Sequence, residues 1–140
     1  MNVGDSFGPS SWVEIAQDRI NGFADATDDH QWIHIDPERA AAGPFGTTIA
    51  HGYLTLSLLI PLFNELLDVQ GVKMSVNYGL EKVRFPAPVR VGGKIRLLGT
   101  VDSVEDVAGN GVQMTLTFTV EIEGGPKPAC VAKALYRHYA

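Results

Sequence analysis

The segment from Gly52 to Asp68 limits most strongly how this chain can fold, because it predicts a helix that is apolar on nearly every side. A surface helix normally carries polar residues along one face, and this segment leaves little polar surface. Pro61 should kink the helix, because proline removes one intrahelical hydrogen bond. We therefore expect a helix that the rest of the chain buries on most sides. Its apolar residues are Tyr53, Leu54, Leu56, Leu58, Leu59, Ile60, Leu62, Phe63, Leu66 and Leu67.

The second half of the chain predicts a sheet that can surround this helix. Residues 112–123 alternate strictly between apolar and polar side chains, which is the period of a half-buried strand. Residues 94–107 predict a partner strand, and a final strand is expected over residues 128–139. Shorter strands are expected over residues 72–78 and 83–85. These hairpins indicate an α+β fold in which an antiparallel sheet curls around one long helix.

The first half predicts shorter elements. A helix is expected from Gln17 to Ala26, while residues 12–15 fit either the start of that helix or a short strand. Asp36 and Pro37 mark a second helix start, because aspartate caps helices and proline is favoured at their first position. No repeat or linker interrupts the chain, so residues 1–140 are expected to form a single domain.

The composition argues against several classes of function. The net charge of −5 disfavours non-specific binding of nucleic acid, which requires a clustered basic surface. The one cysteine, Cys130, cannot form an internal disulfide, which fits a reducing compartment. No signal peptide and no segment of membrane-spanning length are apparent. We therefore expect a cytoplasmic protein that binds neither nucleic acid nor membrane.

The main candidate for chemistry is the segment from Ala26 to His34, which contains two carboxylates, two imidazoles and an indole. On a continuous helix, Asp29 and His34 would lie about 140° apart. If the first helix ends near Thr27, a turn and an extended segment can direct both side chains into one cavity. A carboxylate can then take a proton from a bound water that the imidazole orients. The alternative is that Asp28 or Asp29 only closes the helix and that His34 is a hydrogen-bonded core residue.

A metal site is a second interpretation of this segment, because His30 and His34 have the spacing of the zinc motif His-Glu-x-x-His. That motif requires helical geometry and a glutamate as general base. Gln31 occupies the glutamate position and cannot act as a base, and the helix start at Asp36 argues against a helix over residues 30–34. We therefore expect no metal.

Two further segments could contact a ligand. The buried helix begins after His51, and the first N–H groups of a helix lack intrahelical partners, so the Gly52 N–H could stabilise an oxyanion. A flexible helix entry explains that segment equally well, and a histidine such as His51 more often packs or caps. Lys82, Arg84 and Arg90 could meet the phosphates of a nucleotide-like ligand, although charges at an exposed sheet edge are the commoner explanation.

Taken together, these segments resemble the MaoC-like dehydratases, the (R)-specific enoyl-CoA hydratases, and in particular their NodN-like branch. The family's signature, approximately Gly-Asp-x-Asn-Pro-(Leu/Ile/Val)-His, falls on residues 28–34. Asp29 and His34 match it, whereas Asp28, Gln31 and Trp32 depart from it. Residues 46–55 and 77–88 also match the family, so the resemblance covers nearly the whole chain.

The resemblance implies a hot-dog fold and a homodimer with the acyl-CoA along the subunit interface. It also implies that water adds to trans-2-enoyl-CoA to give (3R)-hydroxyacyl-CoA, with Asp29 as the base and His34 assisting. The Gly52 N–H would then polarise the thioester carbonyl. Coenzyme A is part of the substrate in this reaction, and no separate cofactor is expected.

The same resemblance assigns supporting positions around the pocket. Gln31 and Trp32 are expected to shape the acyl pocket, and His51 to contribute to substrate binding. Independently of the resemblance, the charges of Lys82 and Arg84 make them the expected contacts of coenzyme A. Two alternatives stay open, namely a hot-dog acyl-CoA thioesterase, in which a carboxylate directs water at the thioester carbonyl, and a non-catalytic acyl-CoA-binding protein.

Overall fold

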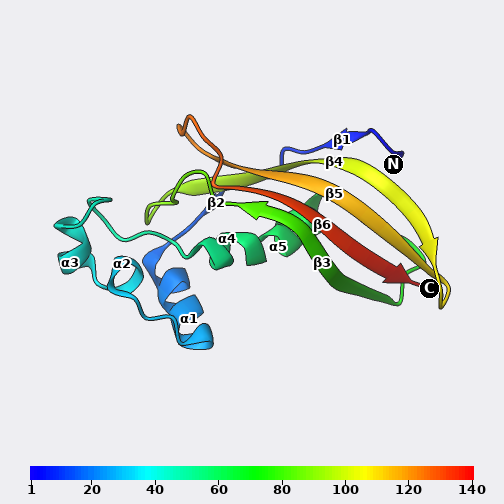
Figure 1. Ribbon diagram of the computed structural model, residues 1–140. Helices are drawn as coiled ribbons and strands as arrows, with labels where there is room; N and C mark the ends of the chain where they lie inside the picture. The colour runs from blue at the N-terminus through cyan, green and yellow to red at the C-terminus, as the bar shows by residue number, and fades with distance from the viewer.

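The computed structural model describes all 140 residues, and its main element is one antiparallel sheet of six strands. Figure 1 shows this sheet curving over α4 and α5, while α1, α2 and α3 gather at one end. The strand order is β1-β4-β5-β6-β3, and β2 also pairs with β4. The predicted α+β architecture is confirmed. The elements are β1 (Ser6–Phe7), β2 (Val13–Glu14), α1 (Gln17–Thr27), α2 (Trp32–Ile35), α3 (Pro37–Ala41), α4 (Gly52–Ser57), α5 (Leu59–Leu66), β3 (Met74–Arg84), β4 (Lys94–Val107), β5 (Gly111–Ile122) and β6 (Cys130–Tyr139).

The core lies between the inner face of the sheet and α5. Alternate residues of β6 are buried along its whole length, and Leu116, Phe118 and Val120 of β5 are inaccessible to solvent. Phe63 of α5 packs on this face, with its ring centroid 5.3 Å from Phe118 and 5.6 Å from Tyr136. Each apolar side chain that is fully buried stabilises the fold by about 1.5–3 kcal/mol. The alternation in the sequence therefore predicts the buried face of the sheet correctly.

The helix predicted over residues 52–68 is divided into α4 and α5, which meet at Leu58. The interruption lies one turn before the kink expected at Pro61, because proline has no N–H to donate to the Ser57 carbonyl four residues earlier. The expectation of burial on most sides is wrong, since Tyr53 is 70% exposed and only one face contacts the sheet. None of the helices combines the length and apolar character needed to cross a membrane. The buried residues of α4 and α5 are Leu54, Thr55, Leu59, Leu62 and Phe63.

β3 is one continuous strand, whereas the sequence predicted two short ones. Its pairing with β6 shifts register twice within residues 77–82, and such irregularities let a strand continue through residues that do not fit the pattern. β3 lies at the edge of the sheet, and all of its residues except Val83 are exposed. One side of this long strand therefore presents unpaired backbone N–H and C=O groups.

The structure also decides the predictions for the first half. Residues 12–15, which fitted either a helix or a strand, contain the strand β2. α1 begins at Gln17 as predicted and extends one residue beyond Ala26. Before α3, the Asp36 side chain accepts a hydrogen bond from the Arg39 N–H at 3.1 Å, as expected of a capping aspartate.

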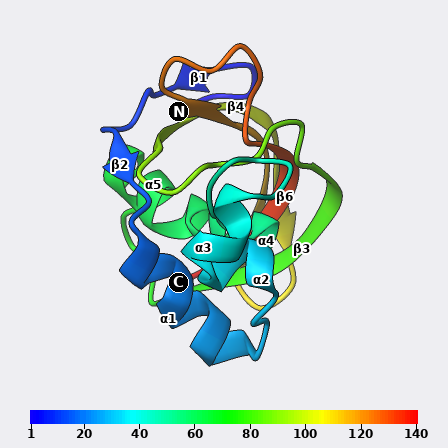
Figure 2. The same ribbon diagram turned by 90° about the vertical axis from the view of Figure 1, so that its left-hand side faces the viewer.

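Residues 30–34 are partly helical, contrary to the prediction. Trp32–Ile35 forms the single turn α2, and the Asp36 N–H donates to the Trp32 carbonyl at 3.1 Å. One helix ends and the next begins at Asp36, so a capping signal does not exclude a helix just before it. Viewed from the end of the molecule where α1, α2 and α3 gather, α2 and α3 lie in front of α4 (Figure 2).

Candidate active site

Asp29 lies in the segment 28–31, which connects α1 to α2. Asp28 ends α1 in the left-handed conformation, with φ 59° and ψ 23°, which aspartate tolerates better than most residues. Asp28 therefore closes the helix, a role that the sequence left open to either aspartate. Asp29 follows this turn with an exposed carboxylate that makes no hydrogen bond within the chain.

His34 is buried in α2, with a relative exposure of 7%. Its Nδ1–H donates to the Ile49 carbonyl at 2.7 Å, so in the neutral ring the lone pair lies on Nε2. Burial lowers the pKa of His34 below its ordinary value, and nearby His51 lowers it further, while the hydrogen bond to Ile49 opposes the shift. His34 is thus a neutral imidazole with one nitrogen available as an acceptor.

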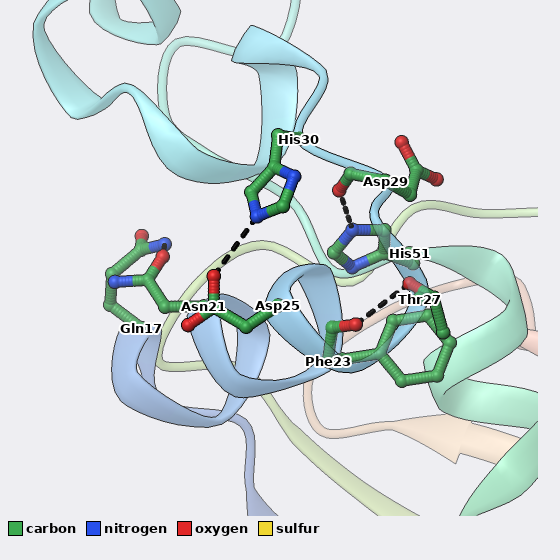
Figure 3. Close-up of polar contacts among 8 residues, drawn as sticks. All are labelled: Gln17, Asn21, Phe23, Asp25, Thr27, Asp29, His30 and His51. Carbon is green, nitrogen blue, oxygen red and sulfur yellow. Dashed lines mark hydrogen bonds and ion pairs between the residues drawn. The ribbon is translucent and has the colours of Figure 1, made fainter.

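His51 joins these two residues immediately before α4. Its Nε2–H donates to the backbone carbonyl of Asp29 at 3.0 Å (Figure 3). Its ring stacks on His34, with centroids 3.8 Å apart and an angle of 24° between the planes. Potential ligand atoms of Asp29, His34 and His51 all lie within 4.8 Å of one another. The predicted convergence of Asp29 and His34 therefore occurs, and His51 belongs to the same cluster.

The same three residues are the group that could hold a metal ion. The sequence instead paired His30 with His34, but His30 Nε2 lies 2.9 Å from the Asp25 carboxylate, at the surface. His51 uses Nε2 to bind the Asp29 backbone, and Figure 3 shows its other nitrogen on the edge of the ring opposite the Asp29 carboxylate. A cation bound to Nε2 of His51 would replace the hydrogen bond to the Asp29 carbonyl. The expectation of no metal stays a prediction.

A cavity of about 330 Å³ lies beside His34 and Gly52. The Gly52 N–H makes no hydrogen bond within the chain. A Cβ atom at Gly52 would lie 3.1 Å from the Phe85 ring, so only glycine leaves this position uncrowded. The lining of the cavity is mostly apolar and consists of His34, Phe45, Ile49, Ala50, Gly52, Thr55, Phe85, Ala87, Pro88, Val89 and Ala129.

Gln31 and Trp32 are not part of this cavity lining. Residues two apart on a helix lie about 200° apart around its axis, so α2 directs Trp32 away from the side that buries His34. Trp32 contacts Arg39, whose guanidinium carbon lies 4.5 Å from its ring centroid, and it also packs against Gly43. Gln31 is exposed at the start of α2. The structure thus gives both residues a place on the outer side of α2.

Lys82 and Arg84 lie near the end of β3 that leads to Phe85. Both are exposed, and neither forms an ion pair with a carboxylate of the chain. Phe85, which follows β3 directly, lines the cavity. The two unpaired cations therefore lie on the strand that leads to the cavity.

The family model described as "MaoC like domain" matches residues 1–122. This chain belongs to the MaoC-like dehydratase family. It is similar to 3-hydroxyacyl-thioester dehydratase Z of Mycobacterium tuberculosis H37Rv, with 58% identity over 138 residues, covering 99% of this chain and 91% of the relative. It is 43% identical over 132 residues to nodulation protein N of Rhizobium leguminosarum, covering 93% of this chain and 82% of that protein.

The structure of this MaoC-like domain resembles that of the (R)-hydratase from A. caviae involved in PHA biosynthesis. The TM-score is 0.79 at 26% identity, covering 97% of this chain and 96% of that one. The hot-dog fold implied by the sequence is therefore confirmed.

Gln17 is a residue of this MaoC-like site that sequence reasoning missed. Its Nε2 donates to the His34 carbonyl at 2.8 Å, and its Oε1 accepts a hydrogen bond from the Thr48 hydroxyl at 2.5 Å. Gln17 thereby ties α1 to the turn that carries His34. Nothing in the spacing along the sequence signals this role, because Gln17 and its two partners, His34 and Thr48, come from three separate segments.

Proposed function

We propose that this protein catalyses the reversible addition of water to trans-2-enoyl-CoA to give (3R)-hydroxyacyl-CoA. The observation that carries the proposal is the meeting of the Asp29 carboxylate and the His34 imidazole next to the apolar cavity. Two relatives support the proposal. One is named as a dehydratase of 3-hydroxyacyl thioesters, and the A. caviae protein is named as an (R)-hydratase.

Asp29 and His34 would both act as hydrogen-bond acceptors for one water molecule, so that its oxygen is free to attack C3 of the enoyl group. As the C3–O bond forms, one water proton passes to the Asp29 carboxylate. The C2=C3 π electrons move onto the thioester carbonyl and form an enolate. The proton held by Asp29 is then delivered to C2, which restores the carboxylate, and dehydration follows the same steps in reverse.

Gly52 would stabilise the enolate through its free backbone N–H. The charge that develops on the thioester oxygen is stabilised by a donor that needs no rearrangement during the reaction, and one such donor contributes about 2.7–4 kcal/mol. The apolar lining around Gly52 strengthens this hydrogen bond by excluding water.

Lys82 and Arg84 would bind the phosphates of coenzyme A, because they are exposed cations without carboxylate partners on the strand that leads to Phe85. Reversing both charges, in Lys82→Glu/Arg84→Glu, should raise KM for an enoyl-CoA about tenfold or more, since each charge-assisted bond contributes roughly 1.5–3 kcal/mol. KM for a truncated pantetheine thioester, which lacks the nucleotide, should not change. An equal effect on both substrates would contradict this assignment.

We also infer a homodimer that pairs through β3. This edge strand is exposed along nearly its whole length, and its exposed side chains include large apolar ones. These are Met74, Val76, Tyr78 and Leu80, all of them at least 37% exposed. A second copy would satisfy the unpaired backbone groups by antiparallel pairing and would cover these side chains.

A spectroscopic assay with trans-2-enoyl-CoA tests the proposed reaction. Hydration removes the absorbance of the conjugated enoyl thioester and leaves the thioester bond intact. A thioesterase would release free CoA thiol, and a non-catalytic binding protein would produce neither change. Thiol release without hydroxyacyl-CoA, or no turnover across a series of chain lengths, would contradict the hydratase proposal.

A further inference from the structure

We propose that His51 is a positioning residue that holds Asp29 and His34 in their reactive arrangement. The inference rests on the proposed function, because those two residues are its catalytic pair. It also goes beyond it, since His51 contacts both catalytic residues through one imidazole and is not in the cavity lining.

The first contact fixes the backbone of Asp29. The bond from His51 Nε2–H to the Asp29 carbonyl is the one hydrogen bond that Asp29 makes within the chain. The other side-chain contact of segment 28–31 is the exposed pair between His30 and Asp25. His51 is only 2% exposed, so its bond is shielded from competing water and anchors a segment that otherwise lies at the surface.

The second contact fixes the ring of His34. His51 covers a face of this ring by stacking, and the Ile49 carbonyl binds its Nδ1–H. Ile49 and His51 belong to the same short segment before α4, so this segment controls both the plane and the tautomer of His34. Neither contact uses the Nε2 atom of His34, so its lone pair stays available to accept a hydrogen bond.

The imidazole at position 51 has a cost that packing alone does not explain. With its proton on Nε2, the Nδ1 atom of His51 is a buried acceptor without a partner, and such an atom destabilises the folded state. A phenyl ring would fill the same space without that penalty. The histidine supplies the one thing a phenyl ring lacks, a donor to Asp29.

Two variants separate the contacts. His51→Phe keeps a ring against His34 and removes the hydrogen bond, and it should lower kcat about 10- to 100-fold, because small displacements of catalytic groups are costly. KM should stay within about twofold, because His51 is not part of the cavity lining. His51→Gln places an amide N–H near the position of Nε2 and should recover part of the lost kcat.

His138 provides the matched control. It is also buried, at 9% exposure, and its Nε2 is also without a partner, but it lies on β6 and binds Ser75. His138→Gln should leave kcat unchanged. If it lowers kcat as much as His51→Phe does, the effect is a general consequence of altering a buried histidine and the proposal is overturned.

Nitrogen-15 NMR of the imidazoles tests the proposal without measuring activity. The wild-type protein should show the proton of His51 on Nε2 and that of His34 on Nδ1. In His51→Phe the pKa of His34 should rise, because the electrostatic effect of His51 is lost while burial is kept. A His51 proton on Nδ1, or an unchanged kcat in His51→Phe, would overturn the proposal. Lack of enoyl-CoA hydration by the wild type would instead reject the proposed function, and the NMR result would still decide the placement of His51.

Discussion

Asp28 and Asp29 are adjacent in the chain, but the backbone gives them different environments. Asp28 ends α1 with a positive φ, and Asp29 is held by its carbonyl next to the two stacked histidines. The difference arises from one left-handed residue, which turns the chain so that only the second carboxylate meets His34. Residue types alone could not make this distinction.

Exchanging each aspartate for asparagine should separate these roles. Asp29→Asn should lower kcat about 10²- to 10⁴-fold, because the amide cannot accept the water proton. Asp28→Asn is the control and should retain full activity, because asparagine also adopts the left-handed conformation. Initial rates of enoyl-CoA hydration would measure both, and a larger loss in Asp28→Asn would reverse the assignment.

The buried state of His34 predicts the pH dependence. Protonation removes the Nε2 lone pair, so kcat/KM should fall as the pH decreases through the pKa of His34 in the free enzyme. Since burial and His51 lower that pKa from its ordinary 6.5, the midpoint of the acidic limb should lie below pH 6.5. A pH–rate profile tests this, and a limb centred above pH 6.5 would contradict it.

The elements α2, α4 and the segment before α4 bring the site together. α2 is only one turn long, which directs His34 inward and Trp32 outward. α4 stops where the carbonyl of Ser57 lacks the N–H that Pro61 cannot supply. The site is therefore built from short elements around the start of α4, where Gly52 lies against Phe85.

Gly52→Ala tests the crowding at the start of α4. The added Cβ would lie 3.1 Å from the Phe85 ring, so the ring and the start of α4 must move apart, and kcat should fall about tenfold or more as the oxyanion donor is displaced. Gly22→Ala in α1 is the control, because its Cβ would meet nothing within 4 Å. That variant should keep its activity and gain about 0.5–1 kcal/mol of unfolding free energy, measured by denaturant titration.

One side of the single chain, formed by β3 and by Tyr53 of α4, is exposed although it carries apolar side chains. The sheet buries one face of α4 and α5, while β3 and Tyr53 stay exposed. The proposed second copy along β3 would cover the exposed side chains of this edge strand. The sequence predicted a helix buried on most sides, and the single chain buries one face of it.

Leu80→Glu should convert the dimer to monomers. Leu80 is 47% exposed on β3, and a carboxylate there would be buried without a partner in the interface. Val104→Glu is the control, since Val104 is 44% exposed on β4, on the opposite side of the sheet from β3. Light scattering after gel filtration would give both masses, and a wild-type monomer would reject the dimer.

The sequence alone was enough for the long strands β4, β5 and β6 and the start of α3, because periodicity and capping are local properties of neighbouring residues. The family motif, also local, singled out Asp29 and His34. The sequence did not determine that His51 rather than His30 completes the cluster, that Gln17 supports His34, or that Trp32 points outward. Those features depend on contacts of Gln17, residues 29–34 and residues 48–52 with one another, and only the folded chain brings these parts together. Side-chain direction within a single helical turn also decides them, because two residues of offset rotate a side chain about 200° around the axis, to the opposite side of the helix.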